Sequence, residues 1–231
     1  GNRPDRRTRA LTRRFDEALD ALHMAYQPLV DVEQQTVFGY EALLRTTAEL
    51  SEPYQVLDAA EQLDRLGDLG RAVRRSVVSQ MATDTSPLQM FVNLHPLELM
   101  DDELSDAASP LSLHAGHVIL EVTERSGLQR VDRLADRIQR LRQMGYRIAI
   151  DDLGSGYSSL NAFAQLQPDY VKLDMALVQL APQDPVRRRL IRSMVQVCGE
   201  LDINVVGEGV ETTEQRDTLQ RLGCNLMQGY L

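Results

Sequence analysis

The sequence predicts an α/β fold, a TIM-type β/α barrel, from three observations. Strand-like segments alternate with helical segments along most of the chain, a pattern typical of parallel strands joined by right-handed crossovers. Eight strand-like segments are present in all, and eight strands with intervening helices are the number that closes this barrel. The alternative is an open, doubly wound sheet, but its glycine fingerprint is missing because Gly154-Ser155-Gly156 lacks the third glycine.

The N-terminal elements predict a departure from the regular barrel. An amphipathic helix is expected over residues 8–22, where apolar side chains such as Leu11 and Phe15 recur at helical spacing. Residues 23–32 and 37–45 read as strands, and the link between them is very short. A parallel crossover needs about a dozen residues, so these two strands should form an antiparallel hairpin. The prediction is therefore a modified barrel whose first strand runs antiparallel.

The remaining elements follow in regular alternation. Further strands are expected at 89–94, 117–122, 147–152, 170–174, 204–208 and 225–230. Helices are expected at 53–66, 69–82, 131–144, 158–166, 185–201 and 213–222. The last strand runs directly into Leu231, so the C-terminal helix expected to close the barrel is absent from this sequence. We divide the chain into an N-terminal linker helix and barrel cap, residues 1–22, and a barrel, residues 23–231.

Composition and charge exclude several classes of protein. The chain is 43% hydrophobic and 26% charged, which is ordinary for a globular protein, and no window is long and apolar enough for a membrane-spanning helix. Its net charge of −9 argues against binding along a nucleic-acid backbone. Cys198 and Cys224 show no CxxC spacing, so we expect a reduced, cytoplasmic location. Because the chain begins at Gly1 rather than Met, we expect upstream domains to be missing. The alternative that this chain is the cytosolic part of a larger, membrane-anchored protein therefore stays open.

Polar side chains collect at the carboxyl ends of the predicted strands. They are Glu41, Arg45, Asn93, Glu121, Asp151, Asp152, Lys172, Asp174, Glu208 and Gln228. In a β/α barrel this rim forms the mouth of the active site. Each carboxylate alone has a simpler explanation, since Asp and Glu after a strand often cap the next helix. Together, however, the carboxylates would repel one another strongly, and divalent cations are the simplest remedy.

The ligand types indicate which cation is bound. The candidate ligands offer oxygen, and hard oxygen donors favour Mg²⁺, Mn²⁺ or Ca²⁺ over zinc or copper. The adjacent pair Asp151 and Asp152 suits two ions, because one carboxylate can bridge the ions while its neighbour reaches the second. Two such ions about 4 Å apart can activate a water and neutralise a phosphodiester. The sequence therefore predicts a site for an anionic phosphate compound.

Blocks of residues along the chain resemble the signature of the EAL-type cyclic di-GMP phosphodiesterases. In chain order they are Tyr26-Gln27-Pro28, Tyr40-Glu41-Ala42-Leu43-Leu44-Arg45, Phe91-Val92-Asn93-Leu94, Leu120-Glu121-Val122-Thr123-Glu124, Asp151-Asp152-Leu153-Gly154-Ser155-Gly156-Tyr157-Ser158-Ser159-Leu160, Val171-Lys172-Leu173-Asp174, Gly207-Glu208-Gly209-Val210-Glu211-Thr212 and Gln228-Gly229-Tyr230-Leu231. The blocks fall in the family's order over about residues 10 to 231. The family is a modified β/α barrel with an antiparallel first strand, which agrees with the hairpin expected above.

The resemblance implies a role for each matching residue. Glu41, Asn93, Glu121 and Asp151 look like ligands of one metal ion, and Asp151, Asp152 and Glu208 look like ligands or neighbours of a second. Lys172 and Glu208 resemble the residues that help to deprotonate the attacking water. Arg45 resembles a phosphate contact, and Gln27 and Gln228 resemble contacts to guanine or nearby groups. Glu124 and Asp174 resemble residues that support the ligands from behind.

The resemblance further implies a metal-dependent phosphodiesterase that hydrolyses cyclic di-GMP to linear pGpG with two Mg²⁺ or Mn²⁺ ions. Ca²⁺ is expected to occupy the site and inhibit turnover, because it prefers looser shells. A homodimer formed near the loop after the fifth strand, and an upstream sensor or GGDEF-type domain, are the expected partners besides cyclic di-GMP. The alternatives are a non-catalytic cyclic di-GMP receptor or protein-interaction module of the same fold, and an enolase-like barrel enzyme with a lysine base.

Overall fold

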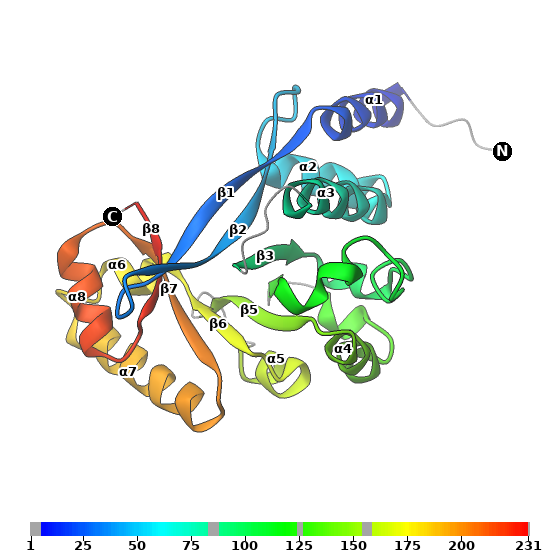
Figure 1. Ribbon diagram of the computed structural model, residues 1–231. Helices are drawn as coiled ribbons and strands as arrows, with labels where there is room; N and C mark the ends of the chain where they lie inside the picture. Colours follow the sequence, from blue (N-terminus) through cyan, green and yellow to red (C-terminus); the bar gives the residue numbers. More distant parts are fainter. Residues whose placement is uncertain (1–5, 83–87, 124–126, 154–158, 231) are drawn as a thin grey trace.

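The computed structural model describes residues 6–82, 88–123, 127–153 and 159–230. Its strands form a closed barrel in chain order from β1 to β8 (Figure 1). The strands are β1 Leu22–Asp31, β2 Thr36–Thr46, β3 Gln89–Leu94, β4 Val118–Thr123, β5 Arg147–Leu153, β6 Tyr170–Leu173, β7 Asn204–Val210 and β8 Leu226–Gly229. The predicted fold class is therefore confirmed.

The first strand runs antiparallel to both of its neighbours, as the short link between residues 32 and 37 predicts. β1 pairs antiparallel with β2 and with β8, and every other neighbouring pair in the barrel is parallel. The β1–β2 pairing shifts register between Leu29 and Val30, so Leu29 faces Gly39 while Val30 faces Val37. Phe38 is the additional residue of this bulge.

The helices lie outside the barrel and agree with the predicted ranges to within a few residues. They are α1 Arg6–Asp20, α2 Pro53–Gln62, α3 Leu66–Met81, α4 Leu134–Gln143, α5 Ser159–Leu166, α6 Met175–Gln179, α7 Pro185–Glu200 and α8 Thr213–Arg221. α2 ends early because Asp64 adopts a left-handed φ of 56°. α6 was not predicted from the sequence, since five residues are too short to show a helical period. Of the described helices, none has the length and apolar character of a membrane span.

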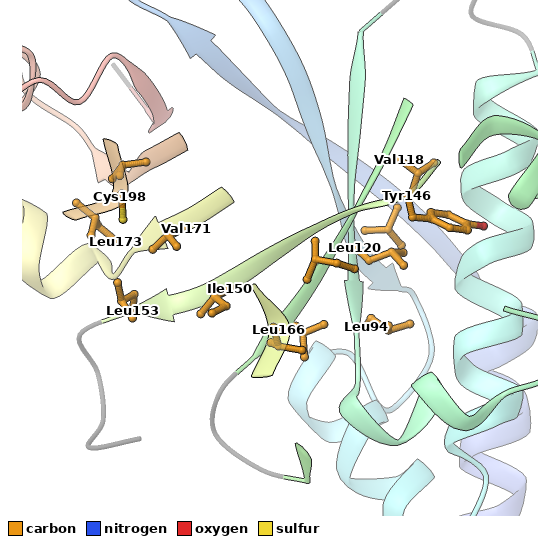
Figure 2. Close-up of a cluster of buried hydrophobic side chains, with 14 of the residues drawn as sticks. Leu94, Val118, Leu120, Tyr146, Ile150, Leu153, Leu166, Val171, Leu173 and Cys198 are labelled. Carbon is orange, nitrogen blue, oxygen red and sulfur yellow. The ribbon is translucent and has the colours of Figure 1, made fainter. Parts of the chain in front are cut away.

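Two apolar clusters lie on opposite sides of the barrel wall. The larger one packs the outward side chains of the strands against the helices, and Figure 2 shows part of it, with Leu120 and Ile150 near Leu166. The other fills the barrel and receives one side chain from each strand. Its members are Leu29, Phe91, Ile119, Ala149, Tyr170, Val206 and Leu226, with Phe38 packed against them. The barrel is thus a filled core below its mouth, as expected for eight strands.

A third apolar cluster fixes α1 against α2 and α3, which lie together beside β2 in Figure 1. Phe15 and Ala18 of α1 are buried there against Val56 and Ala59 of α2. The guanidinium of Arg65 lies 4.9 Å from the centre of the Phe15 ring. These contacts place α1 over the side of the barrel. The division of the chain into a linker helix, residues 1–22, and a barrel, residues 23–231, stays a prediction.

Candidate metal and substrate site

The strand period of two residues brings the predicted polar residues to one place. Side chains two apart on a strand share a face, so a residue two positions beyond a barrel-core residue points into the mouth. The pairs are Phe91 and Asn93, Ile119 and Glu121, Ala149 and Asp151, Tyr170 and Lys172, Val206 and Glu208, and Leu226 and Gln228. On the antiparallel β1, Gln27 precedes Leu29 for the same reason. The apolar core therefore forms the floor of a polar layer.

Lys172 lies at the centre of this layer and is only 1% exposed. Its Nζ is 2.8 Å from Glu208 Oε1, 2.9 Å from Glu121 Oε1, 3.0 Å from Glu41 Oε2 and 3.5 Å from Asp151 Oδ1. Lys172 is also the only lysine in the chain, where all other basic side chains among the 25 Lys and Arg residues are arginine. That composition signal was available in the sequence and marks this position without any structure.

The charges in the layer shift the pKa values in different directions. Burial opposes ionisation of Lys172, but the surrounding carboxylates outweigh it and raise the lysine pKa well above its usual value. Burial raises the pKa of Glu121 well above its usual value, and it raises that of Glu208 to about 7. For Glu41, the effect of burial is outweighed by Lys172 and by hydrogen bonds, so its pKa is lowered. One ammonium group therefore does not balance all of the carboxylates.

Several oxygens of the layer are buried without a hydrogen bond. Within the described part of the chain, neither oxygen of Glu121 accepts one, nor does Asp151 Oδ1 or Gln228 Oε1. Glu121 is fully buried, and its Oε1 approaches Lys172 without the geometry of a hydrogen bond. Glu121 Oε1 and Asp151 Oδ1 still have the Lys172 ammonium as an ion-pair partner, whereas Glu121 Oε2 has no partner among the described residues. A buried carboxylate oxygen in that state is costly, so it fits a bound cation. Because all of the available donors are oxygens, the site suits a hard divalent ion.

Asp151 and Asp152 both reach the same point because β5 is irregular. Neighbouring residues of a regular strand point to opposite faces. Here the β5–β6 register shifts between Ile150 and Leu153, and Asp152 adopts a left-handed φ of 58°. As a result, Asp151, Asp152 and Glu208 each offer an oxygen within 4.8 Å of the others. Of the residues predicted to bind the first ion, this group shares only Asp151, and it could hold a second ion.

Glu41 connects the predicted metal ligands to the predicted substrate contacts. Its Oε1 accepts a hydrogen bond of 2.7 Å from Asn93 Nδ2, and its Oε2 accepts one of 2.7 Å from Gln228 Nε2. The same Gln228 nitrogen donates to Gln27 Oε1 at 3.1 Å. The structure thus brings together residues from β1, β2, β3 and β8.

A cavity of about 530 Å³ opens beside this layer. Glu41, Asn93, Asp152 and Arg45 contribute its polar side, and Arg45 Nη1 donates to the carbonyl of Leu44 at 2.7 Å. Its apolar side includes residues of α2 and α3. These residues include Pro53, Tyr54, Leu57, Leu69 and Val73. Sequence reasoning missed this wall, because apolar residues on a helix are normally interpreted as core.

Two of the predicted supporting residues need separate comment. Asp174 Oδ1 accepts a hydrogen bond of 2.7 Å from the backbone N–H of Ala176, so this carboxylate caps α6. The simpler interpretation of a carboxylate after a strand therefore accounts for Asp174, and its role behind the metal ligands stays a prediction. Glu124 lies outside the described residues, as does the loop at 154–158.

The fold and the site together define a β/α barrel with an acidic mouth. Comparison with known proteins identifies the family: residues 9–231 match the EAL domain. The chain belongs to the EAL domain family.

The similar proteins include signalling enzymes and their solved structures. The chain is 33% identical over 221 residues to the bifunctional diguanylate cyclase/cyclic di-GMP phosphodiesterase MucR of Pseudomonas aeruginosa, covering 91% of this chain and 32% of MucR. The structure of the MucR phosphodiesterase in complex with cyclic di-GMP matches with a TM-score of 0.82 and 31% identity, over 96% of this chain and 95% of that one. The calcium and cyclic di-GMP complex of Klebsiella pneumoniae BlrP1 matches with a TM-score of 0.81 and 30% identity, over 91% and 54%.

The chain spans only about a third of its first curated relatives, 29% and 32% of their lengths.

Proposed function

We propose that this chain is a metal-dependent phosphodiesterase that hydrolyses cyclic di-GMP to linear pGpG. The observation that carries the proposal is the set of buried carboxylates around Lys172, several of whose oxygens accept no hydrogen bond within the described residues. Relatives that share this barrel include proteins named as cyclic di-GMP phosphodiesterases, among them MucR and RocR of Pseudomonas aeruginosa.

The proposed cofactors are two Mg²⁺ or Mn²⁺ ions. Glu41, Asn93, Glu121 and Asp151 would hold one ion, and Asp151, Asp152 and Glu208 would hold or border the other. When bound, such ions lower the pKa of a water and neutralise charge on a phosphodiester. BlrP1 has been solved with both manganese and calcium, and these metals support the choice of a divalent ion.

Other predicted site residues would take part in proton transfer and substrate binding. Lys172 would position the attacking water with its ammonium group, and Glu208, whose Oε1 lies 2.8 Å from Lys172 Nζ, would accept a proton. Arg45 would bind a phosphate with its forked guanidinium. The amides of Gln27 and Gln228 would contact the guanine or nearby groups, and Pro53 and Tyr54 provide an apolar surface in the same cavity.

Incubation with cyclic di-GMP and Mn²⁺, followed by chromatography, tests the proposal. We expect the linear dinucleotide as the product. Ca²⁺ should bind but support little turnover, because its looser coordination fits the reaction less well. Glu41→Ala should abolish the Mn²⁺-dependent reaction. Wild-type turnover by that variant would overturn the ligand assignment, and nucleotide binding without any product would favour the receptor alternative.

We also propose that the chain forms a homodimer through α7 and the neighbouring α5. Four apolar side chains along one side of α7 and at its C-terminal end are exposed by 49 to 61%: Val186, Leu190, Val197 and Leu201. Leu190, Val197 and Leu201 border a groove of about 850 Å³ that also includes Phe163 of α5. Light scattering after chromatography should give a dimer, and Leu190→Glu should convert it to a monomer.

Because the chain spans about a third of its first relatives, we further propose that an additional sensor or GGDEF-type domain controls this activity in the full protein.

A further inference from the structure

A row of alternating charges connects α1 to the segment that follows β3. Arg65 pairs with Asp16 and Asp68, Arg71 pairs with Asp68 and Asp101, and Arg74 pairs with Asp101 and Glu98. Most of these side chains are partly exposed, and surface pairs of that kind contribute little. The last pair is different, because the side chains of Arg74 and Glu98 are only 4% and 9% exposed.

The carboxylate of Glu98 connects helix α3 to the backbone at the end of β3. Its Oε1 accepts a hydrogen bond of 2.9 Å from Arg74 Nη1. Its Oε2 accepts one of 2.9 Å from the backbone N–H of His95. Glu98 therefore contacts both α3 and the first residue after Leu94, the end of the strand.

The sequence of α3 leaves space for this carboxylate. A Cβ atom on Gly70 would lie 1.6 Å from Glu98 Oε1, so no other residue fits there without displacing Glu98. Glycine within a helix is unfavourable relative to alanine. Its presence at this point of α3 is explained by the close approach of Glu98 to the helix backbone.

The same residues border the candidate site. Glu98 and Gly70 line the 530 Å³ cavity together with Asn93 and Arg45. His95, whose N–H Glu98 holds, is two residues beyond Asn93, and the amide of Asn93 donates to Glu41. Neither Arg74 nor Glu98 belongs to the carboxylates around Lys172, so any effect on the metal must act through the backbone that carries Asn93.

We propose that Arg74 and Glu98 are positioning residues that fix the end of β3, and with it the Asn93 side chain, for metal binding. This inference rests on the proposed metal site but not on catalytic turnover. Supporting residues behind metal ligands commonly have large effects on metal affinity, and the Arg74–Glu98 pair holds the backbone N–H of His95, two residues beyond the predicted ligand Asn93.

Mn²⁺ titration of the whole chain, with thermal unfolding measured in parallel, tests the proposal. The single variant Arg74→Met leaves Glu98 buried without its cation, so it should lose stability and bind Mn²⁺ about tenfold more weakly. The double variant Arg74→Met/Glu98→Leu removes both charges of the buried pair, and Asp101 keeps its ion pair with Arg71, so the melting temperature should recover part of the loss. Its Mn²⁺ affinity should stay low, since His95 N–H has lost its acceptor.

A conservative double variant separates positioning from stability. Arg74→Met/Glu98→Gln keeps an oxygen that can accept from His95, so it should regain Mn²⁺ affinity that the leucine variant does not. Arg142→Met is the control, because Arg142 pairs with Asp169 and also donates to the backbone carbonyls of Leu166 and Gln167, so its loss should lower the melting temperature without changing Mn²⁺ affinity.

Two results would overturn the inference: wild-type Mn²⁺ affinity in the leucine double variant, or affinity that follows melting temperature across all variants, the control included. A wild-type chain that binds Mn²⁺ but does not hydrolyse cyclic di-GMP would instead reject only the proposed catalysis. A chain that binds no Mn²⁺ would reject the metal site and this inference together.

Discussion

Lys172 shows how a single residue can hold an acidic site together. Its ammonium group lies within 3.5 Å of four carboxylates and is almost fully buried. An arginine would present a wide planar fork, whereas lysine offers a compact point charge on a flexible stem. The lysine therefore fits the centre of the layer and leaves the outer carboxylate oxygens available to cations.

The raised pKa of Lys172 can be measured directly, because the chain contains no other lysine. Selective isotopic labelling of lysine should give one side-chain resonance in the NMR spectrum. The group is stabilised in its charged form, so the resonance should show no deprotonation up to at least its ordinary pKa of 10.5. Titration at or below that value in the folded protein would show that the carboxylates do not surround the ammonium group as described.

Replacing Lys172 should separate its electrostatic role from its catalytic role. Lys172→Met leaves the carboxylates without their cation, so the metal-free protein should melt at a lower temperature. Mn²⁺ should then raise the melting temperature more than it does in wild type, while turnover falls by about 10²-fold or more. Thermal unfolding and product chromatography check both points. Full turnover would remove Lys172 from the reaction.

The two cysteines should be unreactive in the folded chain. Burial raises the pKa of Cys198 to about 11 and that of Cys224 to about 12, and only the thiolate reacts quickly with alkylating reagents. Since unfolded cysteine ionises near pH 9, their contribution to stability is present below that pH and is lost as the pH rises toward 11 and 12. Mass spectrometry after iodoacetamide at pH 8 should find no label without denaturant. Rapid native labelling would contradict the burial of these thiols.

At the scale of elements, α1 acts as a support for the cavity wall. Leu69 and Val73 of α3 pack against the cluster that holds α1, and both also line the cavity. The helix is amphipathic, and its apolar side packs against α2 and α3, with Leu22 of β1 and Leu44 of β2 beside the same cluster. Loss of α1 packing should therefore affect the stability of this side of the molecule first.

Phe15→Ala should destabilise the protein by about 3–5 kcal/mol, as is typical of a buried phenylalanine replaced by alanine. The loss includes the apolar contacts to α2 and the contact with Arg65. Unfolding in urea gives the change in free energy. Arg9→Ala on the exposed side of the same helix is the control and should change it by less than about 0.5 kcal/mol. Equal effects of the two substitutions would show that α1 is not docked through Phe15.

At the scale of the whole molecule, metal binding should stabilise the closed barrel. The polar layer around Lys172 combines side chains that are far apart in the sequence and meet only in the folded chain. A cation bound there should therefore favour only the folded state. At a Mn²⁺ concentration about 100 times its Kd, the expected gain is about 2.7 kcal/mol. Scanning calorimetry with Mn²⁺ and then with excess chelator should show a reversible shift in melting temperature. A melting temperature that does not respond to Mn²⁺ would count against the metal site.

The order and type of most elements could be predicted from local patterns. The alternation of strand-like and helical segments, the count of eight strands and the short link at 33–36 were sufficient for a barrel with an antiparallel first strand. The positions of Glu121 and Lys172 toward the carboxyl ends of their strands were also predicted correctly. α6 was missed because it has too few residues to show a period.

The sequence by itself determined which chemistry the mouth of the barrel contains, because residue type and strand period are local properties. Only the tertiary structure decided how those groups meet. The left-handed conformation of Asp152 depends on an irregular pairing with a strand that comes later in the chain. The cavity wall depends on helices that contact the barrel across many intervening residues. Such contacts arise from packing between distant segments, and no local pattern encodes them.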